Sequence, residues 1–541
     1  MKLMDAVTAE KLRGAFYTSP ALVEFCLRRI TSLLGVRRGL RLLEPSSGDG
    51  AFLRGLEPFV LRNEIAAPEI TCVELMGTEA AACCEELRRC RLNGHVVNSS
   101  FFSWANNNDV TFDAVVGNPP FVRYQFVPDQ DRLLAEWLLR ANGIELPGVS
   151  NLWIPFVLLS LSTLHEGGAF ALVLPSELLS TISAGQVRAE LVRRFGNLRV
   201  DLFPRDAFPD ILQDVLVLSG IRSHETSARR RVTFAEHSLS GVREWQHEVA
   251  DTGESWTRYL LTSEEREAFS LAKALPGFHP LKEVATIGVA IVTGANDFFA
   301  VDEATIDKFQ LQLWVRPLLA RTADSKGIVF TGDDHREVRH QGKSAWLLDF
   351  SEGRPDPLQS DTAVEYLKMG EAQGLPQRYK CRIRSPWYRV PQIQHGSLMM
   401  AKRSHQHHRL ILNQPRVVTT DTIYRGEMKP AFQGREHELV SGFHNSVTLL
   451  SAEIEGRSYG GGVLELVPSE ISRLTVPLAG TGERLAEMDA VSRGSGGQRD
   501  AQDTLVEATD VLLCRSVAGY CEVADIVISA RQKLRKRRFL G

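Results

Sequence analysis

Short apolar runs and amphipathic segments alternate along the chain from Pro20 to Ile221. The runs 40–43, 70–75 and 112–116 have the length and composition of buried strands, and the segments between them have helical periodicity. Strands that alternate with helices in this way pair in parallel, and the helices cover both faces of the sheet. We therefore predict an α/β fold for this part of the chain. Ligands of such sheets bind at the carboxyl ends of the strands.

The alternation ends after Ile221. The polar stretch RSHETSARRR at 222–231 predicts a linker, and the apolar runs that follow are short and interrupted by Gly, Pro and charged residues. This pattern favours a mixed α+β region, whereas residues 504–537 have a helical pattern after the flexible stretch 492–500. The predicted domains are 1–225, 226–495 and 496–541.

Positive charge is concentrated in one window of a chain whose net charge is only −3. Residues 372–420 contain nine Lys and Arg residues but no Asp or Glu. Such a window suits contact with nucleic-acid phosphates, and a solvated basic face is the alternative. A second basic run, 531–538, fits a solvated helix end at least as well as a DNA contact. The candidate DNA contacts are Arg378, Lys380, Arg382, Arg384, Arg389, Lys402, Arg403 and Arg409.

The most informative motif is Asn118-Pro119-Pro120-Phe121, which directly follows the predicted strand FDAVVG. An Asn side-chain oxygen and a Pro carbonyl can both accept hydrogen bonds from the exocyclic amine of adenine, which aims the nitrogen lone pair at an electrophile. The two prolines fix φ and hold that carbonyl in place, and Phe121 offers a ring face on which a base can stack. A strand-ending turn is the alternative, because Asn and Pro are common in turns.

Two further motifs end the first two predicted strands. The stretch EPSSGDGAF at 44–52 has glycines at 48 and 50, which permit a tight turn and a close approach of the backbone to a ligand. This stretch matches neither the dinucleotide motif GxGxxG nor a P-loop. Glu74 ends the second strand, where an acidic residue commonly binds ribose hydroxyls.

In their order these motifs resemble those of gamma-class, TaqI-like DNA adenine-N6 methyltransferases of restriction–modification or related defence systems. The early segment GAFYTSP at 14–20 comes first, EPSSGDGAF, the acidic strand end and NPPF follow, and a large recognition region comes last. Residues 293–299 and 384–388 resemble recognition-region stretches more loosely. The resemblance implies an N-terminal class I, Rossmann-like methyltransferase domain that binds S-adenosylmethionine, and a C-terminal mixed α+β DNA-recognition region that ends in helices.

The resemblance also implies the reaction and its residues. The chain would transfer a methyl group from S-adenosylmethionine to N6 of an adenine flipped out of double-stranded DNA. Asn118, Pro119, Pro120 and Phe121 would be catalytic, and Phe121 and Phe208 would sandwich the base, with Phe203 as the alternative to Phe208. The implied cofactor-binding residues are Tyr17, Thr18, Glu44, Pro45, Ser46, Gly48, Gly50, Phe52, Glu74, Leu75, Ser100, Phe101 and Asn118.

The sequence departs from the family pattern at two positions. Ser100 stands where the family often has an Asp that faces the adenine of the cofactor, so we expect weaker cofactor binding. Phe121 replaces the commoner Tyr, which preserves stacking and removes a phenol hydrogen bond. Cytosine-N4 relatives usually carry Ser where this chain has Asn118.

Other functions stay open at this point. The motifs also fit methylation of RNA or of a protein glutamine, or a DNA-binding defence protein that has lost catalysis. A fused nuclease is disfavoured, because the nearest match to a nuclease motif, at 355–368, has one residue too many. The eight cysteines lack zinc-site spacing, so we expect reduced thiols and no metal. We expect a cytoplasmic monomer that binds double-stranded DNA, without a membrane segment. A separately encoded restriction endonuclease is a candidate partner, and the sequence does not decide whether one exists.

Overall fold

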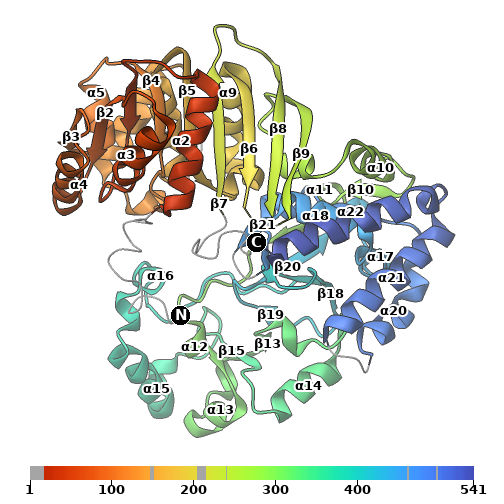
Figure 1. Cartoon of the computed structure of the whole chain (residues 1–541). Coiled ribbons are helices and arrows are strands. Elements are labelled where there is room, and N and C mark those ends of the chain that lie inside the picture. Colours follow the sequence, from red (N-terminus) through yellow and green to blue (C-terminus); the bar gives the residue numbers. More distant parts are fainter. Residues whose placement is uncertain are drawn as a thin grey trace. The chain divides into compact units, whose positions relative to one another are not determined.

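The structure, a computed structural model, describes residues 18–146, 151–203, 215–238, 240–459, 462–494 and 498–540. The chain folds into two compact units (Figure 1). The main part of the first unit ends at Leu260, and the second unit contains most of the chain from Leu261 onward. No helix within these described ranges combines the length and the apolar character needed to cross a membrane.

A nine-stranded sheet in the order β3-β2-β1-β4-β5-β7-β6-β8-β9 forms the centre of the first unit. The five strands from β3 to β5 run parallel, and β7 is antiparallel to both of its neighbours. The strand order reverses between β1 and β4, which makes the carboxyl ends of these strands the switch point where such sheets bind ligands. The strands are β1 (Arg41–Glu44), β2 (Glu69–Glu74), β3 (Gly94–Asn98), β4 (Phe112–Gly117), β5 (Leu164–Pro175), β6 (Phe195–Leu202), β7 (Val215–Arg222), β8 (Arg229–Ser238) and β9 (Gly241–Ala250).

Two groups of helices pack against this sheet, which confirms the predicted α/β fold. One group contains α2 and α3, which lie on the near face of the sheet in Figure 1, and α4. Helices α5, α6 and α7 contact one another, and α7 also contacts α9. The helices are α2 (Pro20–Leu34), α3 (Ala51–Asn63), α4 (Gly77–Arg89), α5 (Phe101–Asn106), α6 (Asp129–Ala141), α7 (Trp153–Ser162), α8 (Glu177–Ser180) and α9 (Gly185–Arg194).

The sheet continues past the predicted domain boundary at residue 225. Strand β8 pairs in parallel with β6, and β9 pairs antiparallel with β8. The polar stretch taken as a linker therefore contains the start of a strand. Its arginines open β8, while Val232 and Phe234 further along the same strand are fully buried. The polar composition marks an exposed strand start, not a domain boundary.

The second unit combines several small sheets with helices, as the mixed α+β prediction requires. Its largest sheet has the order β11-β20-β16-β18-β14, and a second has the order β12-β15-β13-β19. The strands are β10 (Phe278–Pro280), β11 (Ala285–Gly288), β12 (Ala300–Val301), β13 (Val315–Leu319), β14 (Val329–Phe330), β15 (Trp346–Leu348), β16 (Leu398–Ala401), β17 (Arg403–Ser404), β18 (Leu410–Asn413), β19 (Val418–Thr419), β20 (Ile423–Met428), β22 (Val463–Glu465) and β23 (Thr475–Pro477).

Helices surround these sheets and form the C-terminal part of the second unit. Helices α17 and α18 pack against β23 and share a hydrophobic core with the largest sheet. The predicted C-terminal helical segment is two helices, which are separated at Gly519, where φ is +83°. The longer helices are α10 (Ser263–Lys273), α13 (Glu303–Phe309), α14 (Gly332–His340), α15 (Asp361–Ala372), α17 (Glu436–Phe443), α18 (Ser446–Glu455), α20 (Leu485–Ser492), α21 (Gln498–Ser516) and α22 (Tyr520–Leu540).

Candidate active site

The turn after β1 and the acidic end of β2 are joined by hydrogen bonds. The Glu74 carboxylate accepts from the backbone N–H of Gly48 at 2.9 Å and from that of Met76 at 2.8 Å. Gly48 has φ +52°, and a Cβ placed on it would meet nothing within 4 Å. The backbone at Gly48 therefore borders open space. Gly50, with φ +87°, is required by packing instead, because a Cβ there would lie 3.1 Å from Cβ of Glu86.

Glu44 lies beneath this turn and is only 1% exposed. Burial raises the pKa of its carboxyl well above the usual range, and the negative charges of neighbouring groups, Cys83 first, add to the shift. The Cys72 thiol donates to it at 3.7 Å. Phe52 is also buried and belongs to the hydrophobic core of this unit. Both of these predicted cofactor-binding residues are therefore buried.

The Asn118-Pro119-Pro120-Phe121 motif leaves the carboxyl end of β4, beside that turn. Strands β1 and β4 are parallel neighbours, so their ends meet at one edge of the sheet. The Ser46 hydroxyl donates to the backbone carbonyl of Asn118 at 3.1 Å. Pro119 is buried, whereas Asn118 and Phe121 are partly exposed. The structure thus brings together the two motifs that the sequence singled out.

The end of β3 extends the same edge by one strand. The backbone N–H of Ser99 donates to the Glu74 carbonyl at 3.0 Å, and the Asn98 side chain donates to the carbonyls of Glu74 and Leu75. Leu75 is 60% exposed, an apolar side chain that faces outward beside these polar groups. Phe101 is buried at the start of α5, where its ring packs against Phe156.

Sequence reasoning missed one residue of this edge, Asp131 in the first turn of α6. The Ser100 hydroxyl donates to Oδ1 of Asp131 at 2.7 Å. The position that usually carries a carboxylate in the resembled family therefore has one within hydrogen-bond distance. No sequence pattern around Asp131 identifies this role, because the two residues are 31 positions apart.

Three of the residues implied for cofactor or base binding lie at the first described position or outside the described residues. Thr18 is its first residue, while Tyr17 and Phe208 lie outside the described residues. Phe203, the alternative to Phe208, packs edge-on to Phe25 and stacks on His237 at a ring distance of 4.7 Å.

In the second unit, part of the predicted basic window surrounds a cavity of about 590 Å³. Lys380, Arg384 and Arg389 line it together with Arg425, which lies outside the window and was not predicted. Arg384 donates to the carbonyls of Val292 and Thr293, so this cation is held in place by backbone groups. Lys380 and Arg382 are exposed, and Arg378 is partly exposed. This basic cavity has the chemistry of an anion-contacting surface.

Other parts of the predicted basic surface are structural. Arg409 is 8% exposed, and its guanidinium donates to three backbone carbonyls, of Thr322, Ser325 and Gly327. The prediction of a DNA contact at Arg409 is therefore wrong. Lys402 and Arg403 both pair with Glu465, but their side chains are 37% and 61% exposed, so a DNA contact at these two residues stays a prediction. Counting cations along the sequence does not separate buried ones from exposed ones.

The C-terminal basic run is also largely internal. Arg531 and Arg538 on α22 are each 4% exposed. Arg538 pairs with Glu453 at 2.9 Å, and Arg535 pairs with Asp503 at 2.6 Å. The run is neither a solvated helix end nor an open DNA contact at these positions, because the cations neutralise carboxylates of α18 and α21.

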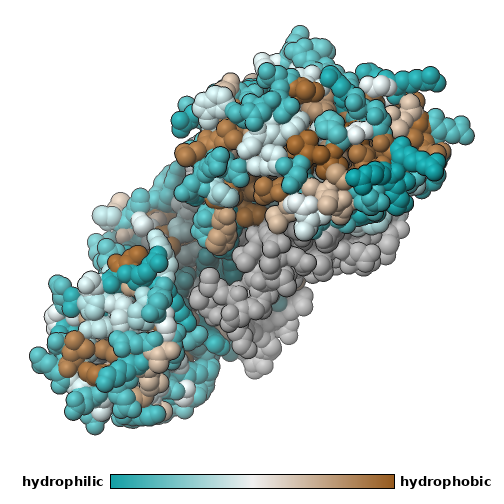
Figure 2. Space-filling model, turned by 90° about the vertical axis from the view of Figure 1, so that its left-hand side faces the viewer, coloured by the Kyte–Doolittle hydropathy of each residue, from teal (hydrophilic) through white to brown (hydrophobic). Residues whose placement is uncertain are grey.

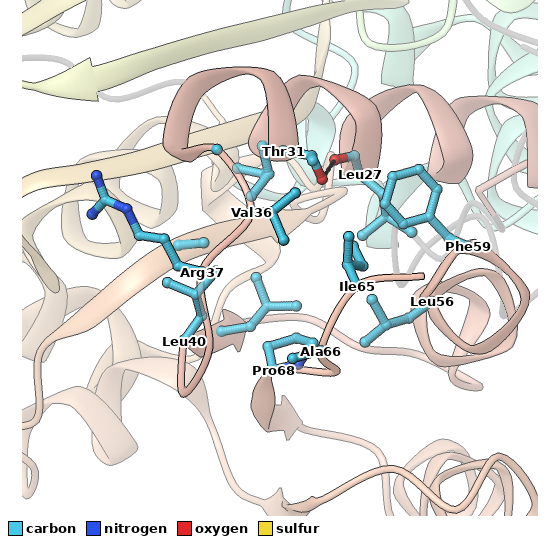
Figure 3. Close-up of a pocket in the computed structure, with 14 residues that line it drawn as sticks. Leu27, Thr31, Val36, Arg37, Leu40, Leu56, Phe59, Ile65, Ala66 and Pro68 are labelled. Atoms are coloured by element: carbon cyan, nitrogen blue, oxygen red, sulfur yellow. Dashed lines mark hydrogen bonds between the residues drawn. The ribbon is translucent and has the colours of Figure 1, made fainter. Parts of the chain in front are cut away.

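A cavity of the first unit lies at the opposite edge of the sheet from the candidate site. Figure 3 shows its apolar lining, which includes Leu40, just before β1, and Pro68, just before β2. These residues mark the amino ends of the strands. Because doubly wound sheets bind ligands at the carboxyl ends, this cavity does not belong to the candidate site.

The surface of the molecule is mixed in character. Figure 2 shows hydrophilic residues over much of one face, with apolar residues gathered in separate patches. Exposed apolar side chains of the first unit include Phe126, Leu133 and Trp137, which come from α6 and the segment before it.

Two protein families match the chain. Residues 69–197 match the family described as Eco57I restriction-modification methylase. Residues 253–512 match the family described as the C-terminal domain of the type II methyltransferase M.Eco57I. The first match contains the end of β2, NPPF and Asp131, and the second contains the basic cavity.

Individual proteins with similar sequences or folds agree with these matches. The chain is 20% identical over 465 residues to the type II methyltransferase M.AccI of Acinetobacter calcoaceticus, which covers 82% of this chain and 81% of that protein. It is 28% identical over 363 residues to the type II methyltransferase M.PaeR7I of Pseudomonas aeruginosa, and the match covers 57% of this chain and 60% of that protein. Its fold is similar to that of the type IIL restriction-modification enzyme MmeI, solved in complex with DNA, with a TM-score of 0.57, 12% identity, and coverage of 98% of this chain and 80% of that one.

Proposed function

We propose that this chain, which belongs to the restriction–modification DNA methyltransferases, transfers the methyl group of S-adenosylmethionine to N6 of an adenine in double-stranded DNA. The observation that carries the proposal is the position of Asn118-Pro119 at the carboxyl end of β4, tied to the turn after β1 by the Ser46 hydroxyl. This arrangement puts acceptors for an amine next to a turn suited to a nucleotide-like ligand.

Two hydrogen-bond acceptors directed at one amine can make that amine a better nucleophile. The adenine amine is a poor nucleophile because its lone pair is delocalised into the ring. Hydrogen bonds from the amine to Oδ1 of Asn118 and to the carbonyl of Pro119 favour a tetrahedral nitrogen and orient its lone pair. When bound, S-adenosylmethionine supplies an electrophilic methyl group. The methyl group would pass to N6 with the C–S bonding electrons left on sulfur, and N6 would release a proton to water.

Residues at the neighbouring strand ends fit the rest of this cofactor. Glu74 has two carboxylate oxygens with about four acceptor sites, and the N–H groups of Gly48 and Met76 use two of them. The remaining sites suit ribose hydroxyls. The open space at Gly48 suits close approach of a ligand to the backbone, and the exposed Leu75 offers an apolar contact for a ring.

The base would reach Asn118 only after leaving the duplex. Phe121, partly exposed beside Asn118, is the candidate surface on which the flipped base stacks. The basic cavity of the second unit is the candidate surface for DNA phosphates, where Lys380, Arg389 and Arg425 would contribute charge.

Replacing Asn118 tests the proposal. Asn118→Ala should lower methyl transfer to duplex DNA by at least ~100-fold, because one of two oriented acceptors is lost. Its affinity for DNA should stay within about threefold of wild type, a small change in binding free energy. A matched control is Asn107→Ala, which removes an exposed amide at the end of α5.

The class of molecule that accepts the methyl group is tested by offering the protein duplex DNA, RNA and bacterial protein extract in parallel. Label that enters RNA or protein but not DNA would contradict the proposal. Full DNA methylation by the Asn118→Ala protein would contradict the role given to this side chain.

A further inference from the structure

Three partly exposed side chains lie along one edge of the first sheet, at the end of β2, after the end of β3 and in the first turn of α6: Glu74, Ser100 and Asp131. Glu74 ends β2, and the hydrogen bond from the Ser99 N–H to the Glu74 carbonyl holds the end of β3 directly beside it. Neighbouring strands lie about 4.8 Å apart. Ser100 therefore stands one strand beyond the carboxylate proposed for ribose hydroxyls, on the side away from β1.

Ser100 holds a carboxylate at this position. Its hydroxyl donates to Oδ1 of Asp131 at 2.7 Å, and Asp131 is partly exposed. This bond uses one of about four acceptor sites of the carboxylate. The exposed apolar side chain of Leu75 lies at the end of the neighbouring strand.

We propose that the Asp131 carboxylate, positioned by Ser100, accepts a hydrogen bond from the exocyclic amine of the adenine of S-adenosylmethionine and thereby selects adenosyl donors. The inference rests on the proposed function, since it assumes that this cofactor binds across the edge of the sheet. With the ribose at Glu74, the base would extend toward the end of β3, where Leu75 would provide a contact for the ring and Asp131 an acceptor for its edge.

A carboxylate at this place discriminates between purines. It accepts from the 6-amine of adenine and repels the 6-carbonyl of hypoxanthine. Asn at the same position has an N–H that can donate to that carbonyl. If Asp131 only stabilised the start of α6, it would not discriminate between adenine and hypoxanthine. Any acid in the first turn of α6 interacts favourably with the helix dipole.

Asp129 provides a matched control for such a capping role. It lies in the same turn of α6 and pairs with Arg132 at the protein surface. Replacing Asp129 with Asn removes the same charge from the same helix end without touching Ser100.

The test is binding, measured by calorimetry on the full chain without DNA. The probes are S-adenosylhomocysteine and S-inosylhomocysteine, in which a 6-carbonyl and a protonated N1 replace the 6-amine and the free N1 of adenine. Wild type and Asp129→Asn should prefer the adenosyl compound by about tenfold or more, and Asp131→Asn should reduce that preference by about tenfold. Ser100→Ala should reduce it by a smaller factor, because the carboxylate remains but loses its anchor.

Each outcome decides one claim. If wild type binds both compounds equally, or if Asp131→Asn keeps the wild-type preference, the inference is wrong while the proposed function stands. If wild type binds neither compound, the proposed function fails and the inference fails with it. If Asp131→Asn does not fold, Ser100→Ala and the wild-type preference decide the question.

Discussion

The Ser46 hydroxyl donates a hydrogen bond of 3.1 Å to the backbone carbonyl of Asn118. This bond links the turn after β1 to the motif after β4, two segments 72 residues apart. Under the proposed function the first segment binds the methyl donor and the second binds the acceptor. The bond therefore helps to fix the positions of the methyl donor and the acceptor relative to each other. A small displacement of one reactant from the other lowers the reaction rate strongly.

Ser46→Ala should slow methyl transfer without loosening the cofactor. Loss of one neutral hydrogen bond costs about 1 kcal/mol, which corresponds to about a fivefold lower rate. The affinity for S-adenosylhomocysteine should change by less than about twofold. Single-turnover methylation and calorimetry measure the two quantities.

Ser99→Ala is the control for that experiment, since the Ser99 hydroxyl bonds to the Ser100 carbonyl and not to the catalytic motif. A Ser46→Ala protein with normal turnover but weak cofactor binding would show that Ser46 serves the cofactor directly.

Exposed cations near the basic cavity should govern DNA affinity. Lys380→Gln and Arg382→Gln remove exposed charges from the second unit. Each change should weaken binding at every DNA sequence and reduce the slope of log K against log salt by about 0.9. Titrations of a fluorescent duplex at several salt concentrations measure the slope. An unchanged slope in both variants would place the phosphate contacts elsewhere.

Arg409 should behave in the opposite way. Arg409→Met removes the donors to three buried carbonyls, so we expect the free energy of unfolding to fall by about 3 kcal/mol. The salt slope of DNA binding should not change. Urea unfolding of this variant beside Arg382→Met, at an exposed position, provides the comparison. Equal stability of the two variants would contradict the structural role of Arg409.

Three buried histidines should make the second unit sensitive to acid. Burial lowers the pKa of His407 and of His408 to about 4, and that of His444 to about 3. The unfolded chain has ordinary histidines with a pKa near 6.5. The unfolded state therefore binds more protons below pH 6.5, and stability is lost as the pH falls from about 6.5 toward 4.

Each of these histidines adds up to ~1.4 kcal/mol per pH unit to the slope of the unfolding free energy. Urea unfolding between pH 7.5 and 4.5 measures this slope. His408→Gln should reduce it by one proton, whereas His405→Gln, at an exposed position, should have a smaller effect. A flat profile in wild type would contradict the burial of these rings.

The sequence predicted the sheet well where strands are short, apolar and followed by helices. β1, β2 and β4 were found in this way, and the positions of Glu74 and Asn118 at strand ends followed from them. The pairing of β8 and β9 was missed, because the arginines that open β8 have the composition of a linker and only their pairing with β9 makes them part of a sheet.

The burial of individual cations could not be predicted from the sequence, for a related reason. Arg409 and Arg538 look like their exposed neighbours in the sequence, and only the fold brings carbonyls and carboxylates to them. Asp131 was missed because Ser100 and Asp131 meet through the packing of α6 beside α5, which leaves no local pattern.

The identity of the methylated nucleoside tests the proposed adenine-N6 methylation directly. Mixed-sequence duplex DNA is incubated with the protein and with S-adenosylmethionine labelled in its methyl group, then digested to nucleosides and separated. We expect label in N6-methyldeoxyadenosine, and at least ~100-fold less label when Asn118 is replaced by Ala. Label in N4-methyldeoxycytidine, or no label in DNA from a protein that binds S-adenosylhomocysteine, would contradict it.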